Sequence, residues 1–160
     1  TNFKNNNIIE TSATPTILIT GAQGMLGRFL CNEYNDCRVT SLGLDSANDT
    51  ICDIANNKPA LSARFDTVIH AAGSTCHENA MEVNLNGTIN LCEALSNNPP
   101  QQFVFISSVQ VYGIDSRESF VNNFYIRWKI WSDFIIYVFL NRPHCLWLAI
   151  AASHISKDSD

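Results

Sequence analysis

Three glycines at intervals of three residues, Gly21, Gly24 and Gly27, are the clearest candidate for chemistry in this sequence. They lie between a short apolar run, TILIT (16–20), and a segment with the apolar pattern of a helix. In a strand–turn–helix unit, the first glycine permits a sharp turn, the second lets a phosphate approach the backbone, and the third lets the helix pack closely on the strand. The N–H groups at the start of such a helix attract anions. The spacing therefore predicts a loop that binds a dinucleotide; the alternative is that these glycines serve only the turn and the packing.

Two carboxylates further along the chain could contact the same nucleotide. Asp45 ends the second expected strand, where it would accept hydrogen bonds from both hydroxyls of an adenosine ribose. Its charge would repel a 2′-phosphate, which favours NAD over NADP, although Arg28 weakens that preference. Asp53 ends a short third strand and could contact the adenine amino group. For either residue, the alternative is an ordinary loop carboxylate or a helix cap.

Short apolar runs that alternate with amphipathic segments must position these residues. Strands are expected at 16–20, 38–44, 50–54, 66–72 and 103–108, and helices at 25–34 and 78–95. The helices are expected to bury two apolar faces, Met25, Leu26, Phe29 and Leu30 in the first, and Met81, Leu85, Ile89 and Cys92 in the second. Strands that alternate with helices predict parallel strands joined by right-handed crossovers, and hence a doubly wound α/β sheet.

The composition limits the kinds of partner. A chain of 160 residues with 46% hydrophobic and 16% charged residues suits one folded domain, and its net charge of −5 argues against a nucleic-acid partner. The six cysteines are scattered without metal-binding spacing, which predicts reduced thiols in a cytoplasmic protein that holds no metal.

The last part of the chain differs in composition from the rest. Nine of the sixteen aromatic residues follow residue 116. A membrane helix needs about 20 uninterrupted apolar residues, and NRPH (141–144) interrupts this stretch, so no membrane partner is expected. The predicted organisation is a flexible leader (1–13), a dinucleotide-binding domain (14–116) and a divergent aromatic-rich tail (117–160).

Five motifs in order resemble the extended short-chain dehydrogenase/reductase family, which includes sugar-nucleotide epimerases, dehydratases and reductases. They are TGAQGMLG (20–27), CDI (52–54), VIHAAG (68–73), VNLNGT (83–88) and FISSVQVYG (105–113). The resemblance implies a Rossmann-like fold that binds NAD, or alternatively NADP, and acts on nucleotide sugars by hydride transfer, in a homodimer. Family members continue for about as much chain again, which predicts that this is the N-terminal half of a truncated or frame-shifted member.

The resemblance also implies a role for each matching residue. Those near the cofactor would be Gly21, Gly24, Met25, Leu26 and Gly27 at the pyrophosphate, Asp45 at the ribose, Asp53 and Ile54 at the adenine, Ala71, Ala72 and Gly73 under the cofactor, Ser107 beside it, and Asn84 at the loop near the nicotinamide ribose. From the residues alone, Asn84 could equally be a solvated helix position. His70 is interpreted as a packed histidine rather than an acid or base.

The catalytic group of the family resembles a serine, a tyrosine and a lysine. Ser108 matches the serine, and Tyr125 with Lys129 forms the one Y-x-x-x-K of the sequence. In the family, the tyrosine exchanges the substrate's hydroxyl proton, and the lysine lowers the tyrosine pKa. Here Tyr125 follows Ser108 by only 17 residues, and Trp128 stands where a small residue is usual. These departures leave two alternatives open: a non-catalytic NAD(P)-binding module, or an inactive fragment.

Overall fold

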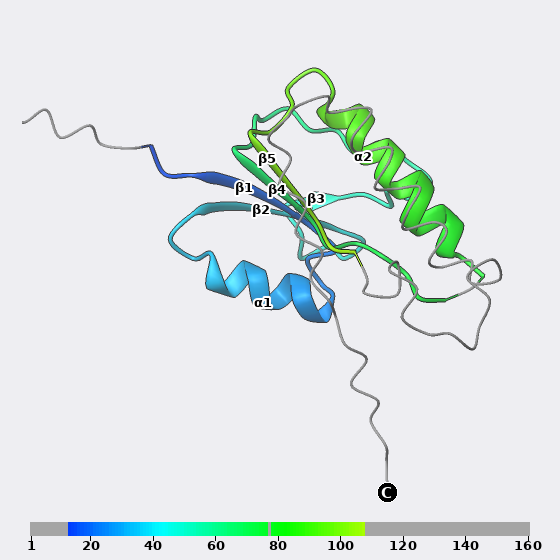
Figure 1. The fold of residues 1–160 in the computed structure, drawn as a ribbon. Helices are drawn as coiled ribbons and strands as arrows, with labels where there is room; N and C mark the ends of the chain where they lie inside the picture. Colours follow the sequence, from blue (N-terminus) through cyan, green and yellow to red (C-terminus); the bar gives the residue numbers. More distant parts are fainter. Residues whose placement is uncertain (1–12, 77, 108–160) are drawn as a thin grey trace, which may run out of the picture.

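The computed structural model describes residues 13–76 and 78–107, which form a parallel sheet with helices on both faces (Figure 1). The described strands lie in the order β3-β2-β1-β4-β5, so the chain starts at the centre, builds one edge and then crosses back. The strands are β1 (Thr16–Thr20), β2 (Arg38–Gly43), β3 (Thr50–Ile51), β4 (Thr67–His70) and β5 (Gln102–Phe105). This order confirms the predicted doubly wound α/β sheet of the Rossmann type.

The sheet is covered on both faces, which explains the continuous apolar character of its central strands. On one face, α1 (Met25–Glu33) packs against a core cluster of Ile17, Ile19 and Ile69. On the other face, α2 (Gly87–Leu95) packs against a larger cluster that includes Leu18, Val68 and two phenylalanines of β5 (Figure 1). Among the described residues, no helix is long and apolar enough to cross a membrane.

Four of the strands end earlier than the sequence predicts, always at the carboxyl end. β3 is the shortest, since only Thr50 and Ile51 pair with β2 along this edge of the sheet. The residues expected to extend β3 and β4, 52–54 and 71–72, leave the ladder and form loops. The residues that follow β2, β3 and β4 instead line a cavity above the strand ends.

The predicted apolar stripe of α1 is wrong at two positions. Met25 is 91% exposed and Phe29 is 56% exposed, whereas Leu30 contacts the core. The fully buried residue of the helix is Gly27. A Cβ atom at Gly27 would lie 2.2 Å from the carbonyl oxygen of Gly21, so the helix approaches the preceding loop along a face without side chains. That close approach turns Met25 and Phe29 away from the sheet.

The second helix also buries a different face from the one predicted. It begins with a π-helical segment, η1 (Met81–Asn86), and continues directly as α2. Of the four predicted core positions only Cys92 is fully buried; Met81 is 43% exposed. The buried positions of this segment are Ala80, Asn84, Gly87, Thr88, Leu91, Cys92 and Leu95. The prediction failed in the first half of the helix, where the buried side carries small and hydrogen-bonded polar residues; in the second half, Leu91 and Leu95 supply the apolar contact with the sheet.

Asp66 ties together three strands at the edge of the sheet opposite the cavity. Its Oδ2 accepts hydrogen bonds from the backbone N–H and the hydroxyl of Thr16, each at 2.9 Å. Its carbonyl oxygen accepts from the N–H of Gln102 at 2.9 Å. The bonds from the Thr16 N–H and hydroxyl lower the pKa of the Asp66 carboxyl below its ordinary value.

We expect Asp66→Asn to lower the free energy of unfolding near neutral pH and to lose this effect in acid. Because the folded pKa of Asp66 lies below the unfolded value of about 3.8, its stabilisation is complete above that value and is lost as the pH falls through the folded pKa. Urea unfolding of both proteins at about pH 7 and about pH 3 measures the difference. A difference of equal size at the two pH values would contradict the assignment.

Candidate functional site

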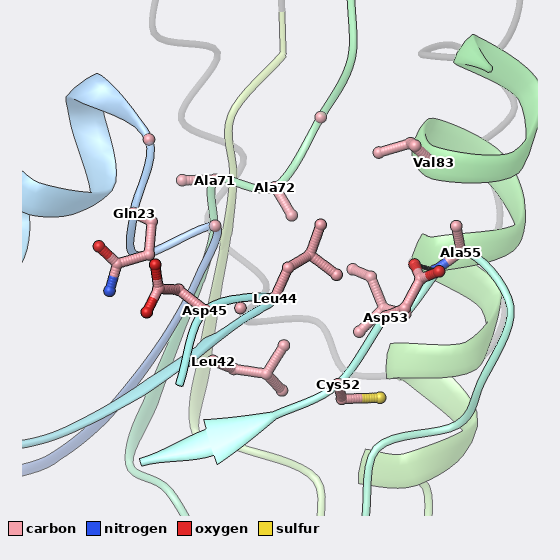
Figure 2. A pocket seen from close by; sticks show the side chains of 15 residues that line it. Gln23, Leu42, Leu44, Asp45, Cys52, Asp53, Ala55, Ala71, Ala72 and Val83 are labelled. Atoms are coloured by element: carbon pink, nitrogen blue, oxygen red, sulfur yellow. Dashed lines mark hydrogen bonds between the residues drawn. The ribbon is translucent and has the colours of Figure 1, made fainter. Parts of the chain in front are cut away.

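A cavity of about 320 Å³ opens at the carboxyl ends of the parallel strands (Figure 2). Four loops line it: the glycine-rich loop after β1, the loop after β2, the loop after β3 and the loop after β4, with Val83 of η1 beside them. The neighbouring strands β1 and β4 lead to helices on opposite faces of the sheet, so their loops diverge between them. In doubly wound sheets, ligands bind in the crevice at this point of divergence.

The structure brings eight of the predicted cofactor-binding residues to this cavity. They are Gly21, Gly24, Asp45, Asp53, Ile54, Ala71, Ala72 and Gly73. Met25, Leu26, Gly27, Asn84 and Ser107 do not line it. The predicted catalytic residues Ser108, Tyr125 and Lys129 lie outside the described residues, as do the aromatic-rich tail and nearly all of the leader.

Two of the three glycines are required by the fold itself. Gly21 has a φ of +67°, a conformation that favours glycine, and a Cβ there would lie 2.7 Å from the Cα of Ala72. Gly27 is required by the packing of α1 described above. Gly24 differs, because it is exposed, its φ is −68°, and the nearest neighbour of an added Cβ would be the Gly21 oxygen at 3.2 Å. Turn and packing therefore require glycine at positions 21 and 27. At position 24 the contact is milder, because an added Cβ would need the Gly21 oxygen to shift by only a few tenths of an ångström.

At the start of α1, next to this loop, lie backbone N–H groups that make no hydrogen bond within the helix. Gly24 is the N-cap residue, no described side chain caps the helix, and the first turn carries no acidic residue. The first N–H groups of a helix lack partners within the helix. Met25 and Leu26 do not line the cavity through their side chains, but their backbone N–H groups belong to this turn. The turn thus offers N–H groups and the positive end of the helix dipole to an anion.

Asp45 lies in the loop after β2, at the end of the cavity where Figure 2 shows Gln23. Its Oδ1 accepts a hydrogen bond from the N–H of Ala47 at 2.8 Å, and its carbonyl oxygen accepts one from the Nδ2 of Asn48 at 2.8 Å. The Oδ1 of Asn48 accepts from Gln23 at 3.3 Å, so the loop that carries Asp45 is joined to the glycine-rich loop.

Asn48 is a structural residue that sequence reasoning missed. It is only 7% exposed, and its Nδ2 would lie 2.8 Å from a Cβ added to Gly43. The spacing of Asp45 and Asn48 in LDSAND is typical of a turn closed by side-chain hydrogen bonds, which is the signal that could have identified it.

Asp53 and its neighbours form the other end of the cavity (Figure 2). The carboxylate of Asp53 accepts hydrogen bonds from the N–H of Ala55 at 3.1 Å and from the Nδ2 of Asn56 at 2.7 Å. These bonds match the loop-carboxylate alternative. Burial, together with the charge of Asp53, raises the pKa of the Cys52 thiol, so that side chain is an uncharged part of the wall. With Leu42 and Ile54, it gives this end an apolar surface suited to a flat ring.

The fourth wall, the loop after β4, is held by Asn84. This residue is 1% exposed, so the alternative of a solvated helix position is wrong. Its Oδ1 accepts from the N–H of Ser74 at 2.9 Å, and its Nδ2 donates to the carbonyl oxygen of Ser74 at 2.7 Å. His70, at the end of β4, is completely buried between two threonines, as expected for a packed histidine.

Ser107 follows β5 and carries a buried hydroxyl that lacks a hydrogen-bond partner, the one such side-chain group among the described residues. A buried hydroxyl left without a partner costs about 1–3 kcal/mol. Ser107 does not line the cavity, so this hydroxyl is not a contact for a ligand there. The N–H groups of the first turn of α1 and the apolar end of the cavity are the features that fit a phosphate-containing nucleotide.

Comparison with known proteins agrees with this arrangement. The model of the NAD dependent epimerase/dehydratase family matches residues 17–130. No curated protein sequence gives a significant match.

Solved structures resemble the chain at low sequence identity. UDP-galactose 4-epimerase is 19% identical, with a TM-score of 0.66 over 84% of this chain and 55% of that chain. The dTDP-4-dehydrorhamnose reductase of Bacillus anthracis, in complex with NADP, is 23% identical, with a TM-score of 0.66 over 81% of this chain and 51% of that one. MoeE5, in complex with UDP-glucuronic acid and NAD, is 21% identical, with a TM-score of 0.64 over 84% and 52%. At these identities the likeness shows the fold alone, and the chain spans about half the length of these structures.

We expect Gly27→Ala and Gly24→Ala to differ strongly in their effect on stability. The methyl group at position 27 would overlap the Gly21 oxygen, which should lower the free energy of unfolding by about 1–3 kcal/mol. The methyl group at position 24 would lie 3.2 Å from the same oxygen, which a shift of a few tenths of an ångström relieves, so its effect should be smaller, at most about 1 kcal/mol. Urea unfolding of the two variants tests this, and equal losses would show that both glycines serve the fold alone.

Proposed function

The chain belongs to the NAD dependent epimerase/dehydratase family, and on that premise we propose that its cavity binds NAD as the cofactor-binding part of an enzyme that acts on nucleotide sugars. The observation that carries the proposal is the open glycine-rich loop beneath the N-terminus of α1. The fold constrains Gly24 less than Gly21 or Gly27, and its exposed backbone forms the N-cap of a helix whose first turn has no side-chain cap. A pyrophosphate at this position would receive backbone N–H groups and the helix dipole.

The remaining walls support a dinucleotide rather than a lone phosphate. The adenosine ribose would lie at Asp45, whose Oδ2 makes no hydrogen bond with the described residues. The adenine would lie between Ile54 and Leu42, in the apolar end of the cavity. Ala71, Ala72 and Gly73 would support the middle of the cofactor, where larger side chains would occupy its space.

The proposed chemistry follows the family. A bound nicotinamide would supply a hydride acceptor or donor. Ser108 would donate a hydrogen bond to the oxygen of the substrate, Tyr125 would take or give its hydroxyl proton, and the ammonium of Lys129 would favour the ionised tyrosine. Nucleotide sugars are the proposed substrates because the similar solved structures include a UDP-galactose epimerase and a complex with UDP-glucuronic acid.

A second candidate function is a non-catalytic NAD(P)-binding module. The observation that favours it is the spacing of Tyr125, 17 residues after Ser108, together with Trp128 next to Lys129. Incubation of the chain with NAD and UDP-sugars, followed by chromatography of the sugars and by the absorbance of NADH, separates the two candidates. Turnover that is lost in Tyr125→Phe supports the enzyme, whereas nucleotide binding without turnover supports the module.

Calorimetric titration with NAD is the first test of the proposal. We expect a dissociation constant on the order of micromolar, and a loss of at least about tenfold in Gly24→Val, because the branched side chain would occupy the space of the pyrophosphate. Ala60→Val, which adds similar bulk at an exposed loop residue, is the control and should bind as the unaltered chain does. Absence of binding to NAD and to NADP in the unaltered chain would refute the proposal.

The preference for NAD over NADP should depend on Asp45. An asparagine there can still accept the hydrogen bond from Ala47 but carries no charge, so the repulsion of a 2′-phosphate is removed. We expect Asp45→Asn to lower the ratio of NAD affinity to NADP affinity by about tenfold. Asp36→Asn makes the same change in net charge at an exposed residue near the start of β2, away from the cavity, and should leave the ratio unchanged. An equal shift in both variants would assign the preference to net charge instead.

A further inference from the structure

His70 lies at the centre of a line of buried hydrogen bonds that joins β1, β4 and α2. It is 0% exposed, with its Nδ1 at 2.6 Å from the Oγ1 of Thr20 and its Nε2 at 3.0 Å from the Oγ1 of Thr88. Both threonines are also 0% exposed. The ring lies beside two aromatic rings of the neighbouring strand β5, Phe103 and Phe105, whose centroids are 6.2 and 5.5 Å away.

The surrounding bonds determine which nitrogen of His70 carries the hydrogen. The hydroxyl of Thr88 donates its single hydrogen to the carbonyl oxygen of Asn84 at 2.7 Å. It must therefore accept from His70, which places the imidazole hydrogen on Nε2. Nδ1 then accepts from the hydroxyl of Thr20, and the oxygen of that hydroxyl accepts from the N–H of Ala72 at 3.2 Å. Every donor in the line has an acceptor.

The two ends of this line of hydrogen bonds, Thr20 and Asn84, bind the two ends of the loop after β4. Thr20 holds the backbone of Ala72, and Asn84 holds Ser74 through both atoms of its amide. The line of side chains and the short backbone segment 72–74 therefore form a closed ring of hydrogen bonds. This segment includes Ala72 and Gly73, which line the cavity.

We infer that His70 is a positioning residue for the nucleotide: as the Nε2–H tautomer, it closes the ring that sets the backbone of 71–74 against the cofactor. The inference rests on the proposed binding of NAD. The loop has little freedom to compensate for an opened ring, because the backbone of Ala72 already lies within 2.7 Å of where a Cβ of Gly21 would be. Buried groups that lose a partner here also have no route to water, since Thr20, His70 and Thr88 are all fully buried.

Three isosteric variants test the inference in the full chain. Thr20→Val removes the hydroxyl that accepts the hydrogen bond from Ala72. Thr88→Val opens the ring of hydrogen bonds on the other side of His70, at a residue that is connected to the loop only through His70 and Asn84. Thr16→Val, on the same strand as Thr20, removes a hydroxyl that bonds to Asp66 at the opposite edge of the sheet. All three should lower the melting temperature. Only the first two should weaken NAD binding, by about fivefold or more, and Thr20→Ser should restore it.

Two spectroscopic readouts separate positioning from general loss of stability. Nitrogen-15 NMR of the unaltered chain should show His70 with a protonated Nε2 and an unprotonated Nδ1. Amide hydrogen exchange at Ala72 and Ser74 should accelerate in Thr20→Val and Thr88→Val, and not in Thr16→Val. An Nδ1–H tautomer, or equal effects of Thr88→Val and Thr16→Val on affinity and exchange, would overturn the inference.

The proposed function and this inference can fail separately. If the unaltered chain binds neither NAD nor NADP, the proposed function is wrong. The tautomer of His70 and the amide exchange of Ala72 and Ser74 then decide whether the ring positions the loop. Faster exchange in Thr20→Val and Thr88→Val, but not in Thr16→Val, would support the inference, and equal exchange in all three variants would overturn it.

Discussion

The contact between the backbone of Gly21 and the backbone of Ala72 is the constraint on which the rest of this structure depends. Gly21 could not carry a side chain at this contact, since a Cβ there would lie 2.7 Å from the Cα and the nitrogen of Ala72. The contact forces the chain into a left-handed turn after β1 and sends it away from β4. Because the two loops touch at their roots and lead to opposite faces of the sheet, a crevice must open beyond them.

The two helices approach the loops on either side of this contact in different ways. α1 approaches the turn through Gly27, which leaves Met25 and Phe29 on its outer side. The second helix approaches the loop after β4 through polar residues, of which Asn84 and Thr88 are fully buried and fully hydrogen-bonded. Buried polar groups that all have partners fix a unique geometry, whereas an apolar contact of the same area would tolerate sliding. The loops at the cavity are thus held by directional bonds rather than by packing alone.

The parts of the fold that depend on apolar periodicity could be predicted from the sequence. The parts that depend on a close approach of one backbone segment to another could not. The run TILIT is apolar and β-branched throughout because both of its faces are covered, and its bounds were predicted correctly. The faces of the helices were predicted from their large apolar residues, and this rule fails where Gly27 and Gly87 make the contact. At Gly87, a Cβ would lie 3.2 Å from the side chain of Ile54, so a small residue occupies the centre of the buried face.

Predictions for the candidate site divide in the same way. Glycine spacing and the residues after each strand end placed the loops correctly, because the carboxyl ends of parallel strands share one edge of the sheet. Asn48 was missed, because its role comes from contacts with Gly43 and Gln23 that are distant in the sequence or appear only once the turn has formed. The local spacing of Asp45 and Asn48 indicates the turn, but it does not predict that the side chain of Asn48 is buried against Gly43.

Gly24 is the glycine of this loop that the fold constrains least. It adds conformational freedom to the unfolded chain, at a cost of about 0.5–1 kcal/mol relative to alanine, and an added Cβ would lie 3.2 Å from the Gly21 oxygen, a contact that a small shift relieves. Ser107 also carries a cost, a buried hydroxyl without a partner among the described residues, but it does not line the cavity. At Gly24, by contrast, a phosphate against this edge of the sheet would make the glycine favourable, because the ligand then needs the space that a side chain would occupy.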